Sequence, residues 1–148
     1  MADPFKLKPP KKFKLRSWKP RETHLQAALF DWVKWEVARR PELYLIYAVP
    51  NGAVAGPGRF ATVNWMKSQG MKNGVPDVCL PVPRGGFCAL YIEMKTESGE
   101  LTDEQDKFIA VLRHYGNKVV VCRSSESAIA EITEYLDDRD PPSARPGA

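Results

Sequence analysis

The chain lacks the features of several protein classes. No apolar run reaches the roughly 18 residues that a membrane-spanning helix needs, and the first residues lack the apolar segment of a secretory signal peptide. The three cysteines are odd in number and show no Cys-x-x-Cys spacing, so a disulfide framework and a zinc site are not expected. We therefore predict a soluble cytoplasmic protein in which Cys79, Cys88 and Cys122, all in apolar stretches, are buried free thiols.

The net charge of +4 is distributed unevenly along the 148 residues. Residues 1–21 hold eight Lys or Arg and a single acid, Asp3, which gives this segment a net charge of +7 and the remainder −3. Basic residues interleaved with aromatic ones are typical of a segment that contacts phosphate groups, although a solvated tail has a similar composition. The candidate DNA-contacting residues of this arm are Lys11, Lys12, Lys14, Arg16 and Lys19.

The pattern predicts three segments: a basic N-terminal arm (1–19), one domain (20–136) and a flexible C-terminal tail (137–148). Within the domain, apolar periodicity and capping residues predict helices and strands in alternation. Helices are expected at 20–40, 60–69, 102–115 and 125–136, and strands at 43–49, 78–82, 87–92 and 118–122. This order predicts an α/β fold in which a small mixed sheet is flanked by helices.

Polar residues gather at the ends of the two strands predicted around the turn at 83–86. Asp77 opens the first strand, Glu93 lies near the end of the second, and Lys95 follows two residues later on the same face. In an antiparallel pair the start of one strand lies beside the end of its partner, so the two carboxylates are expected to be close together. Carboxylates bind hard divalent cations, and a lysine beside them can orient a water; a solvated hairpin end with an incidental ion pair is the plainer alternative.

The polar pattern Pro76-Asp77 followed by Glu93-Met94-Lys95 resembles the PD-(D/E)XK nuclease signature. Three further stretches, 49–52 (VPNG), 70–77 (GMKNGVPD) and 98–105 (SGELTDEQ), resemble the VRR-NUC branch of that superfamily, and the likeness extends over roughly Glu22 to Leu136. It implies a restriction-endonuclease-like α-β-β-β-α-β core, Mg²⁺ or Mn²⁺ as cofactor, and DNA, branched or double-stranded, as partner. Because this family includes phage proteins, the resemblance implies a location in the cytoplasm of a bacterium or of a phage-infected host cell.

The resemblance also implies roles for residues beyond the signature. Glu22, in a Glu-x-x-x-Gln pattern with Gln26, is expected to join Asp77 and Glu93 as a metal ligand, with the backbone carbonyl of Met94 as a further one. From the residues alone, Glu22 is better explained by its favourable interaction with the helix dipole, which requires no ligand role. Gln105 fits a capping box with Thr102 and, in the family, lies near the site. Asn51, Arg59, Lys67 and Lys72 are candidate DNA contacts, although solvated surfaces and loops carry such residues too.

These features lead to one main hypothesis and two alternatives. The main one is a metal-dependent endonuclease that cuts branched DNA such as Holliday junctions and acts as a homodimer, as free-standing members of the family do. The alternatives are a flap or duplex nuclease of restriction or exonuclease type, and a non-catalytic DNA-binding protein of the same fold. Tyr44, Tyr47, Phe60 and Trp65 are expected at the dimer contact, unless they fill the core.

Overall fold

The computed structural model describes residues 21–50 and 58–138. The elements follow in the order α1 (Glu22–Glu36), the 3-10 helix η1 (Pro41–Leu45), β1 (Tyr47–Ala48), α2 (Arg59–Ser68), β2 (Val78–Leu80), β3 (Leu90–Met94), α3 (Asp103–His114), β4 (Lys118–Cys122) and α4 (Ser125–Asp137). The predicted α/β class is confirmed. The arm up to Lys19, Asn51 and the tail beyond Asp138 lie outside the described residues.

The sheet is mixed, with strand order β1-β2-β3-β4. β1, β2 and β3 pair antiparallel, whereas β3 and β4 are parallel and are connected by α3. A parallel pair needs a crossover connection, and a helix is the usual one. This arrangement agrees with the expected restriction-endonuclease-like core and places β2 and β3 at the centre of the sheet.

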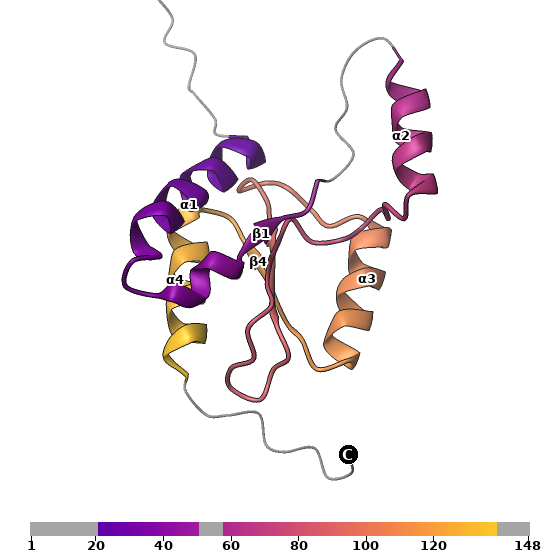
Figure 1. Cartoon of the computed structure of the whole chain (residues 1–148). Helices are drawn as coiled ribbons and strands as arrows, with labels where there is room; N and C mark the ends of the chain where they lie inside the picture. Colours follow the sequence, from indigo (N-terminus) through magenta and orange to yellow (C-terminus); the bar gives the residue numbers. More distant parts are fainter. Residues whose placement is uncertain (1–20, 51–57, 139–148) are drawn as a thin grey trace, which may run out of the picture.

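Helices cover both faces of the sheet, α1 and α4 on one and α3 on the other (Figure 1). Side chains alternate along the strands, so Val78, Leu80, Ile92 and Met94 enter the core formed with α1 and α4. The same alternation turns Glu93 away from that core and towards α3. The core therefore fixes the strands from one face while the polar residues of β3 lie on the other.

Helix α1 packs through Leu25, Leu29 and Val33, which are spaced by four residues and are all buried. Helical spacing places Ala28 and Trp32 on the same apolar stripe, but Ala28 is exposed and Trp32 is half-buried. The helix starts at Glu22, and the Arg21 amide before it donates to His24 Nδ1 at 3.1 Å. It ends at Glu36, four residues before Arg40, and a turn leads to Pro41.

The strand predicted at 43–49 is wrong for most of its length. Pro41 starts the 3-10 helix η1, and β1 is reduced to Tyr47 and Ala48. Proline favours the first position of a helical turn because its φ angle is already suitable. Leu43 and Ile46 are buried, but Tyr44 is 85% exposed, so the apolar content of this stretch does not mark a strand covered on both sides.

Other boundaries also differ from the sequence prediction. The strands β2 and β3 are separated by nine residues, and the connection includes Pro81 and Pro83, which lack the amide needed to continue a ladder. Cys88, in this connection, is exposed, whereas Cys79 and Cys122 are buried free thiols as predicted. Helical spacing places Phe108, Val111, Leu112 and Tyr115 on one apolar face of α3. Val111 and Tyr115 are nevertheless exposed, Phe108 and Leu112 are half-buried, and the buried residue is Ile109.

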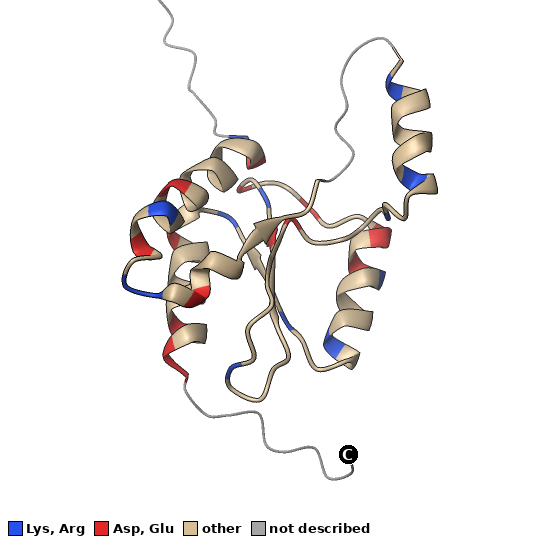
Figure 2. Ribbon diagram, viewed as in Figure 1, with Lys and Arg blue, Asp and Glu red and all other residues tan. Residues whose placement is uncertain are grey.

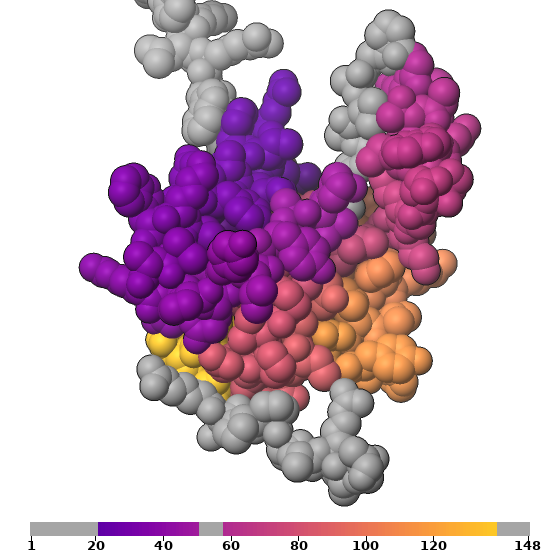
Figure 3. All heavy atoms as spheres, viewed as in Figure 1, coloured from indigo at the N-terminus to yellow at the C-terminus, as the bar shows by residue number. Residues whose placement is uncertain are grey.

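Helix α2 stands apart from the two helical layers and buries none of its residues (Figures 1 and 3). Phe60 and Trp65 are among its exposed side chains. Across the described part of the chain, no helix has the length and apolar character needed to cross a membrane.

Candidate active site

The polar residues predicted to meet are brought together where β2 begins and β3 ends. Val78 pairs with Ile92, so Asp77 and Glu93 lie side by side at the next position of the two antiparallel strands. Lys95 follows β3 directly, and Glu22 is the first residue of α1. Four residues from three separate parts of the sequence therefore converge on one edge of the sheet.

Glu93 is the most enclosed of these groups, with a residue exposure of 1%. Its Oε1 accepts hydrogen bonds from Gln105 Nε2 at 2.5 Å and from Lys95 Nζ at 3.0 Å. Its Oε2 is also buried, but finds no hydrogen-bond partner within the described residues. A buried carboxylate oxygen without a partner is costly, and such an oxygen is a natural ligand for a cation.

The surroundings of Glu93 disfavour its charged form. Burial raises the pKa of this carboxyl from 4.5 to about 7, against the opposing effect of the Lys95 ammonium. The nearby carboxylates of Asp77 and Glu22 raise the pKa of Glu93 further. A perturbed carboxyl at a strand end, beside two other acids, is typical of a functional site.

Lys95 connects two of the acids. Its Nζ lies 3.0 Å from Glu93 Oε1 and 3.8 Å from Glu22 Oε1, and the lysine itself is buried. The Glu22 side chain is about half exposed, because it extends from the first turn of α1 over the end of the strand. This position explains how a residue 55 places before Asp77 in the sequence reaches the same edge of the sheet.

Asp77 is held by both its side chain and its backbone. Oδ2 accepts a hydrogen bond from the Met94 amide at 2.8 Å, and the Asp77 carbonyl accepts one from the Val49 amide at 2.7 Å. The first bond fixes the carboxylate against the end of β3. The second ties it to the chain immediately after β1.

Gln105 makes both a capping contact and a contact with Glu93. Its Oε1 accepts from the Thr102 amide at 3.0 Å and its own amide donates to Thr102 Oγ1, which completes the predicted capping box. The other end of the same side-chain amide is the Nε2 that donates to Glu93. The start of α3 is therefore connected directly to the buried carboxylate.

The donor set suits a hard divalent cation, although the side chains are not arranged around one. In the described parts of the chain, no three His, Cys, Asp or Glu side chains are close enough to hold a single ion, and the Lys95 ammonium lies near both Glu93 and Glu22. The unpartnered Glu93 Oε2 and the adjacent Asp77 carboxylate are nevertheless oxygen donors of the kind that Mg²⁺, Mn²⁺ and Ca²⁺ prefer.

The candidate DNA contacts on α2 are not part of this cluster. Arg59 begins α2 with its guanidinium over the Phe60 ring at 4.9 Å, Lys67 lies in the last turn, and Lys72 is in the following loop. All of them are exposed. They lie on the segment that leads from β1 to Asp77.

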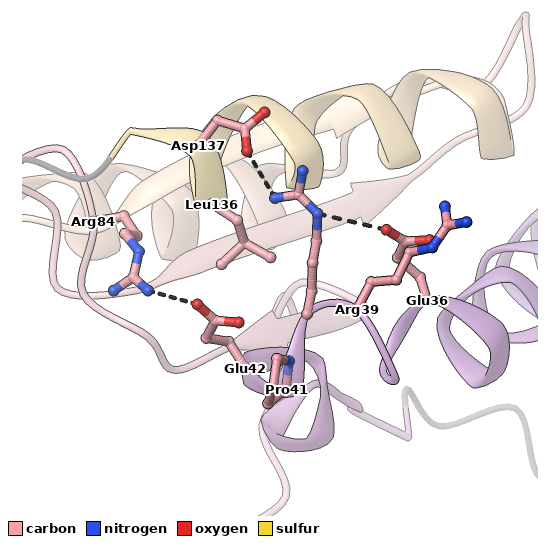
Figure 4. Close-up of a pocket in the computed structure, with 8 residues that line it drawn as sticks. Glu36, Arg39, Pro41, Glu42, Arg84, Leu136 and Asp137 are labelled. Carbon is pink, nitrogen blue, oxygen red and sulfur yellow. Dashed lines mark hydrogen bonds and ion pairs between the residues drawn. The ribbon is translucent and has the colours of Figure 1, made fainter.

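A cavity of about 670 Å³ lies away from these residues and is lined by ion pairs that hold the fold together (Figure 4). It lies at the far end of α1, since Glu36 is separated from Glu22 by about 20 Å of helix. Its lining acids are paired: Arg40 contacts Asp137 at 2.9 Å and Glu36 at 3.6 Å, and Arg84 contacts Glu42 at 2.8 Å. These ion pairs connect α1, η1, α4 and the β2-β3 connection.

Sequence reasoning missed one residue near the site, Arg123. Its Nη1 donates to the carbonyl oxygens of Thr96 at 2.7 Å, Glu97 at 3.1 Å and Gly99 at 2.7 Å. These residues form the turn directly after Lys95, and a side chain at Gly99 would meet the Lys95 Cδ at 3.3 Å. Arg123 lies beyond β4 and belongs to no motif, so its role depends on the parallel pairing of β3 and β4.

Comparison with known proteins agrees with this geometry. The family model of the VRR-NUC domain matches residues 17–126. A solved structure described as a VRR_NUC domain protein superposes with a TM-score of 0.70 at 25% identity, covering 83% of this chain and 93% of that one. None of the curated proteins shows significant similarity to the sequence. The chain therefore belongs to the VRR-NUC family, which consists of PD-(D/E)XK-type nucleases that act on DNA and are typically metal-dependent.

Proposed function

We propose that the protein is a metal-dependent endonuclease that hydrolyses phosphodiester bonds in branched DNA, such as Holliday junctions. The observation that carries this proposal is the convergence of Asp77, Glu93 and Lys95, with the buried Glu93 Oε2 lacking a partner among the described residues. A hairpin end with an incidental ion pair would be solvated, whereas Glu93 and Lys95 are both buried.

Glu22, Asp77, Glu93 and the Met94 carbonyl would hold Mg²⁺ or Mn²⁺. When bound, the ion would neutralise charge on the scissile phosphate and lower the pKa of a coordinated water. Gln105 keeps the Glu93 carboxylate in place through the bond to Oε1. Because this contact engages Oε1, Oε2 would be the oxygen that binds the ion.

We assign to Lys95 the role of orienting the attacking water. Its ammonium, enclosed beside Glu93, would donate a hydrogen bond that orients the water for in-line attack on phosphorus. The water oxygen forms a bond to phosphorus while the bond from phosphorus to the 3′ oxygen breaks, which leaves a 5′-phosphate and a 3′-hydroxyl. Asp77, bonded to the Met94 amide, keeps its position relative to β3 during this step.

The surrounding basic residues would bind the DNA backbone. Arg59, Lys67 and Lys72, on and after α2, are exposed. The arm residues and the polar Asn51 lie outside the described part of the chain. The two groups would contact phosphates without reading sequence.

A homodimer would place two active sites against two strands of a branched substrate. Exposed rings support it: Tyr44, Tyr47, Phe60 and Trp65 all lie on the surface and do not fill the core. Aromatic side chains are frequent anchors of protein interfaces. Sedimentation equilibrium at micromolar protein concentration tests the dimer, and a monomer would favour a flap or duplex nuclease.

The decisive experiment is cleavage of labelled four-way, flap, duplex and single-stranded DNA with Mg²⁺ or Mn²⁺. We expect four-way junctions to be cut fastest and the Lys95→Ala variant to lose at least about 100-fold in rate. The control is Lys118→Ala, which removes a lysine paired with Glu131 away from the site. Binding without cleavage of any substrate would instead support the non-catalytic alternative.

A further inference from the structure

A second cavity lies beside the active site, between α2 and the end of β1. Its volume is about 470 Å³, within the range of pockets that bind small molecules. The lining is mostly apolar, with two longer polar side chains among it. The residues are Val49, Pro50, Trp65, Met66, Gln69, Gly70, Met71, Lys72 and Val75.

The wall of this cavity is connected to Asp77 through the backbone, although none of the candidate catalytic residues lines it. Its wall residue Val49 donates its amide to the Asp77 carbonyl at 2.7 Å, and Val75 precedes Asp77 by two positions. Next to Val75, Gly74 has a positive φ of 83° and lies so close to α3 that a Cβ would be 2.5 Å from the Glu104 carbonyl oxygen. The segment joining the cavity to Asp77 is thus fixed against the same helix that supplies Gln105.

The segment that supplies most of the cavity wall carries charge of one sign. Residues 58–76 include Arg59, Lys67 and Lys72 and contain neither Asp nor Glu. Figure 2 shows basic residues at both ends of α2 and no acidic residue on it. A strand of nucleic acid is attracted to such a surface, and its phosphates complement the lysines.

We propose that this cavity receives one unpaired base of the DNA substrate, stacked against Trp65, with Lys67 and Lys72 contacting the neighbouring phosphates. The inference rests on the proposed nuclease function and narrows its substrate. Aromatic side chains stack on the faces of unpaired bases, and Met66 and Met71 supply polarisable contacts. The Gln69 amide supplies a hydrogen-bonding group for the base edge.

The proposal defines the class of DNA that the active site accepts. A base inside a continuous duplex has both faces covered by its neighbours, so it enters a pocket only after unstacking. Flaps supply such nucleotides without that cost, whereas a fully paired four-way junction has to unpair one at its branch point. The substrate is therefore DNA with an unpaired nucleotide close to the scissile phosphate.

A different occupant, a second copy of the chain, would use Trp65 as a dimer anchor. The described lining distinguishes Trp65 from the other exposed rings, because Tyr44, Tyr47 and Phe60 do not line the cavity. Thr62→Ala, at an exposed residue of the same helix that does not line the cavity, serves as a control. Trp35→Ala, at an exposed tryptophan of α1, controls for loss of an indole elsewhere.

The test compares binding of three fluorescent DNAs in EDTA, which prevents cleavage: a duplex with a single-stranded flap, the same DNA with an abasic nucleotide at the flap junction, and a continuous duplex. We expect Trp65→Ala to weaken flap binding by about 5- to 150-fold and duplex binding by less than about 2-fold. The abasic nucleotide should weaken binding by the wild type and have no further effect on Trp65→Ala. Both controls should bind as the wild type does.

Since α2 buries no residue and Trp35 is exposed, all three variants should fold, which circular dichroism checks. Equal binding of flap and duplex by the wild type, or equal weakening of both by Trp65→Ala, would overturn the inference. So would a Trp65→Ala variant that becomes monomeric but still discriminates the abasic DNA. Cleavage with Mg²⁺ separates the two proposals: if the wild type cuts flaps and Trp65→Ala behaves identically, the base site is wrong and the nuclease function stands.

Discussion

The Asp77 carboxylate accepts a hydrogen bond from the amide of Met94, with 2.8 Å between Oδ2 and N. Pairing between β2 and β3 runs from Leu80 and Leu90 to Val78 and Ile92, so this side chain continues the ladder by one more bond. Because Met94 is fully buried, its amide would lose this acceptor if the Asp77 carboxylate were removed. Asp77 thus has a structural function in addition to the proposed catalytic one.

The two functions of Asp77 are separable by substitution. Asp77→Ala should abolish cleavage and also lower the free energy of unfolding by about 1–3 kcal/mol, because the buried Met94 amide loses its acceptor. Asp77→Asn keeps an acceptor oxygen and should be stable but inactive. Urea unfolding and cleavage assays check both variants, and an alanine variant as stable as the asparagine one would contradict the structural function.

The metal-free protein should become less stable as pH rises through the range set by Glu93. The folded-state pKa of about 7 lies above the ordinary 4.5, so the folded protein binds the proton more tightly between these values. The contribution of this group is therefore greatest below about 4.5, falls as the pH rises to about 7, and is constant above that.

Glu93→Gln removes this titration and isolates it from the other groups. We expect the difference in melting temperature between Glu93→Gln and wild type, measured in EDTA, to grow in favour of the variant from about pH 4.5 to about pH 7. Glu131→Gln, at an ion pair with Lys118 away from the site, is the control for the loss of a paired carboxylate. A difference that does not change with pH would mean that the Glu93 carboxyl is not perturbed.

Gln105 should affect catalysis through Glu93 and stability through its cap. Gln105→Ala removes one half of a capping box, which costs about 0.5–2 kcal/mol, and also the contact to Glu93 Oε1. Ser127→Ala removes the equivalent half of the Ser124 capping box in α4 and touches no catalytic group. Both variants should melt earlier, but only Gln105→Ala should lose rate, by about 10-fold or more. Equal rates would restrict Gln105 to capping.

Arg123 should position Lys95 without contacting substrate. Arg123→Ala releases three carbonyl oxygens of the turn at 96–99, so we expect a lower kcat with little change in KM. The matched control is Arg113→Ala, whose guanidinium bonds a single carbonyl, that of Val119, away from the site. A change in KM alone would show that Arg123 binds DNA directly.

The basic arm should contribute affinity and not chemistry. Deleting residues 1–18 removes Lys11, Lys12, Lys14 and Arg16. The slope of log affinity against log salt should then decrease by about 0.9 for each DNA phosphate that the arm neutralises in the full-length protein. Cleavage at saturating enzyme and low salt should persist. An unchanged slope would identify the arm as a tail that does not touch DNA.

The elements that the sequence predicted best were those with two independent signals. Helix α3 combines the Thr102 and Gln105 capping box with an amphipathic pattern, and α1 shows apolar residues at every fourth position. The meeting of Asp77 and Glu93 followed from antiparallel pairing and holds despite the shift in strand ends. Val78 and Ile92 pair directly beside these two carboxylates, so the longer connection at 81–89 does not separate them.

The errors have a common physical origin. The stretch at 43–49 has the composition of a strand, but Pro41 initiates a 3-10 turn before it, and composition alone does not show which side chains find a partner surface. Ser125 is of a residue type that commonly caps helices, but Ser124 is the cap of α4 and Ser125 is its first helical residue. Arg123 was missed because its partners lie 24 to 27 residues away, and only the parallel β3-β4 pair brings them near.

Helix α2, which buries no side chain, can open locally without exposing any of the core. Its backbone amides should therefore exchange with solvent deuterium far faster than those of α1 or β3. Substitutions on this helix likewise cost little in folding free energy, because its side chains pack against no core. The fold therefore places little constraint on the sequence of α2. Substitutions that alter the proposed base site, and with it the substrate preference, can accumulate there during evolution without loss of stability.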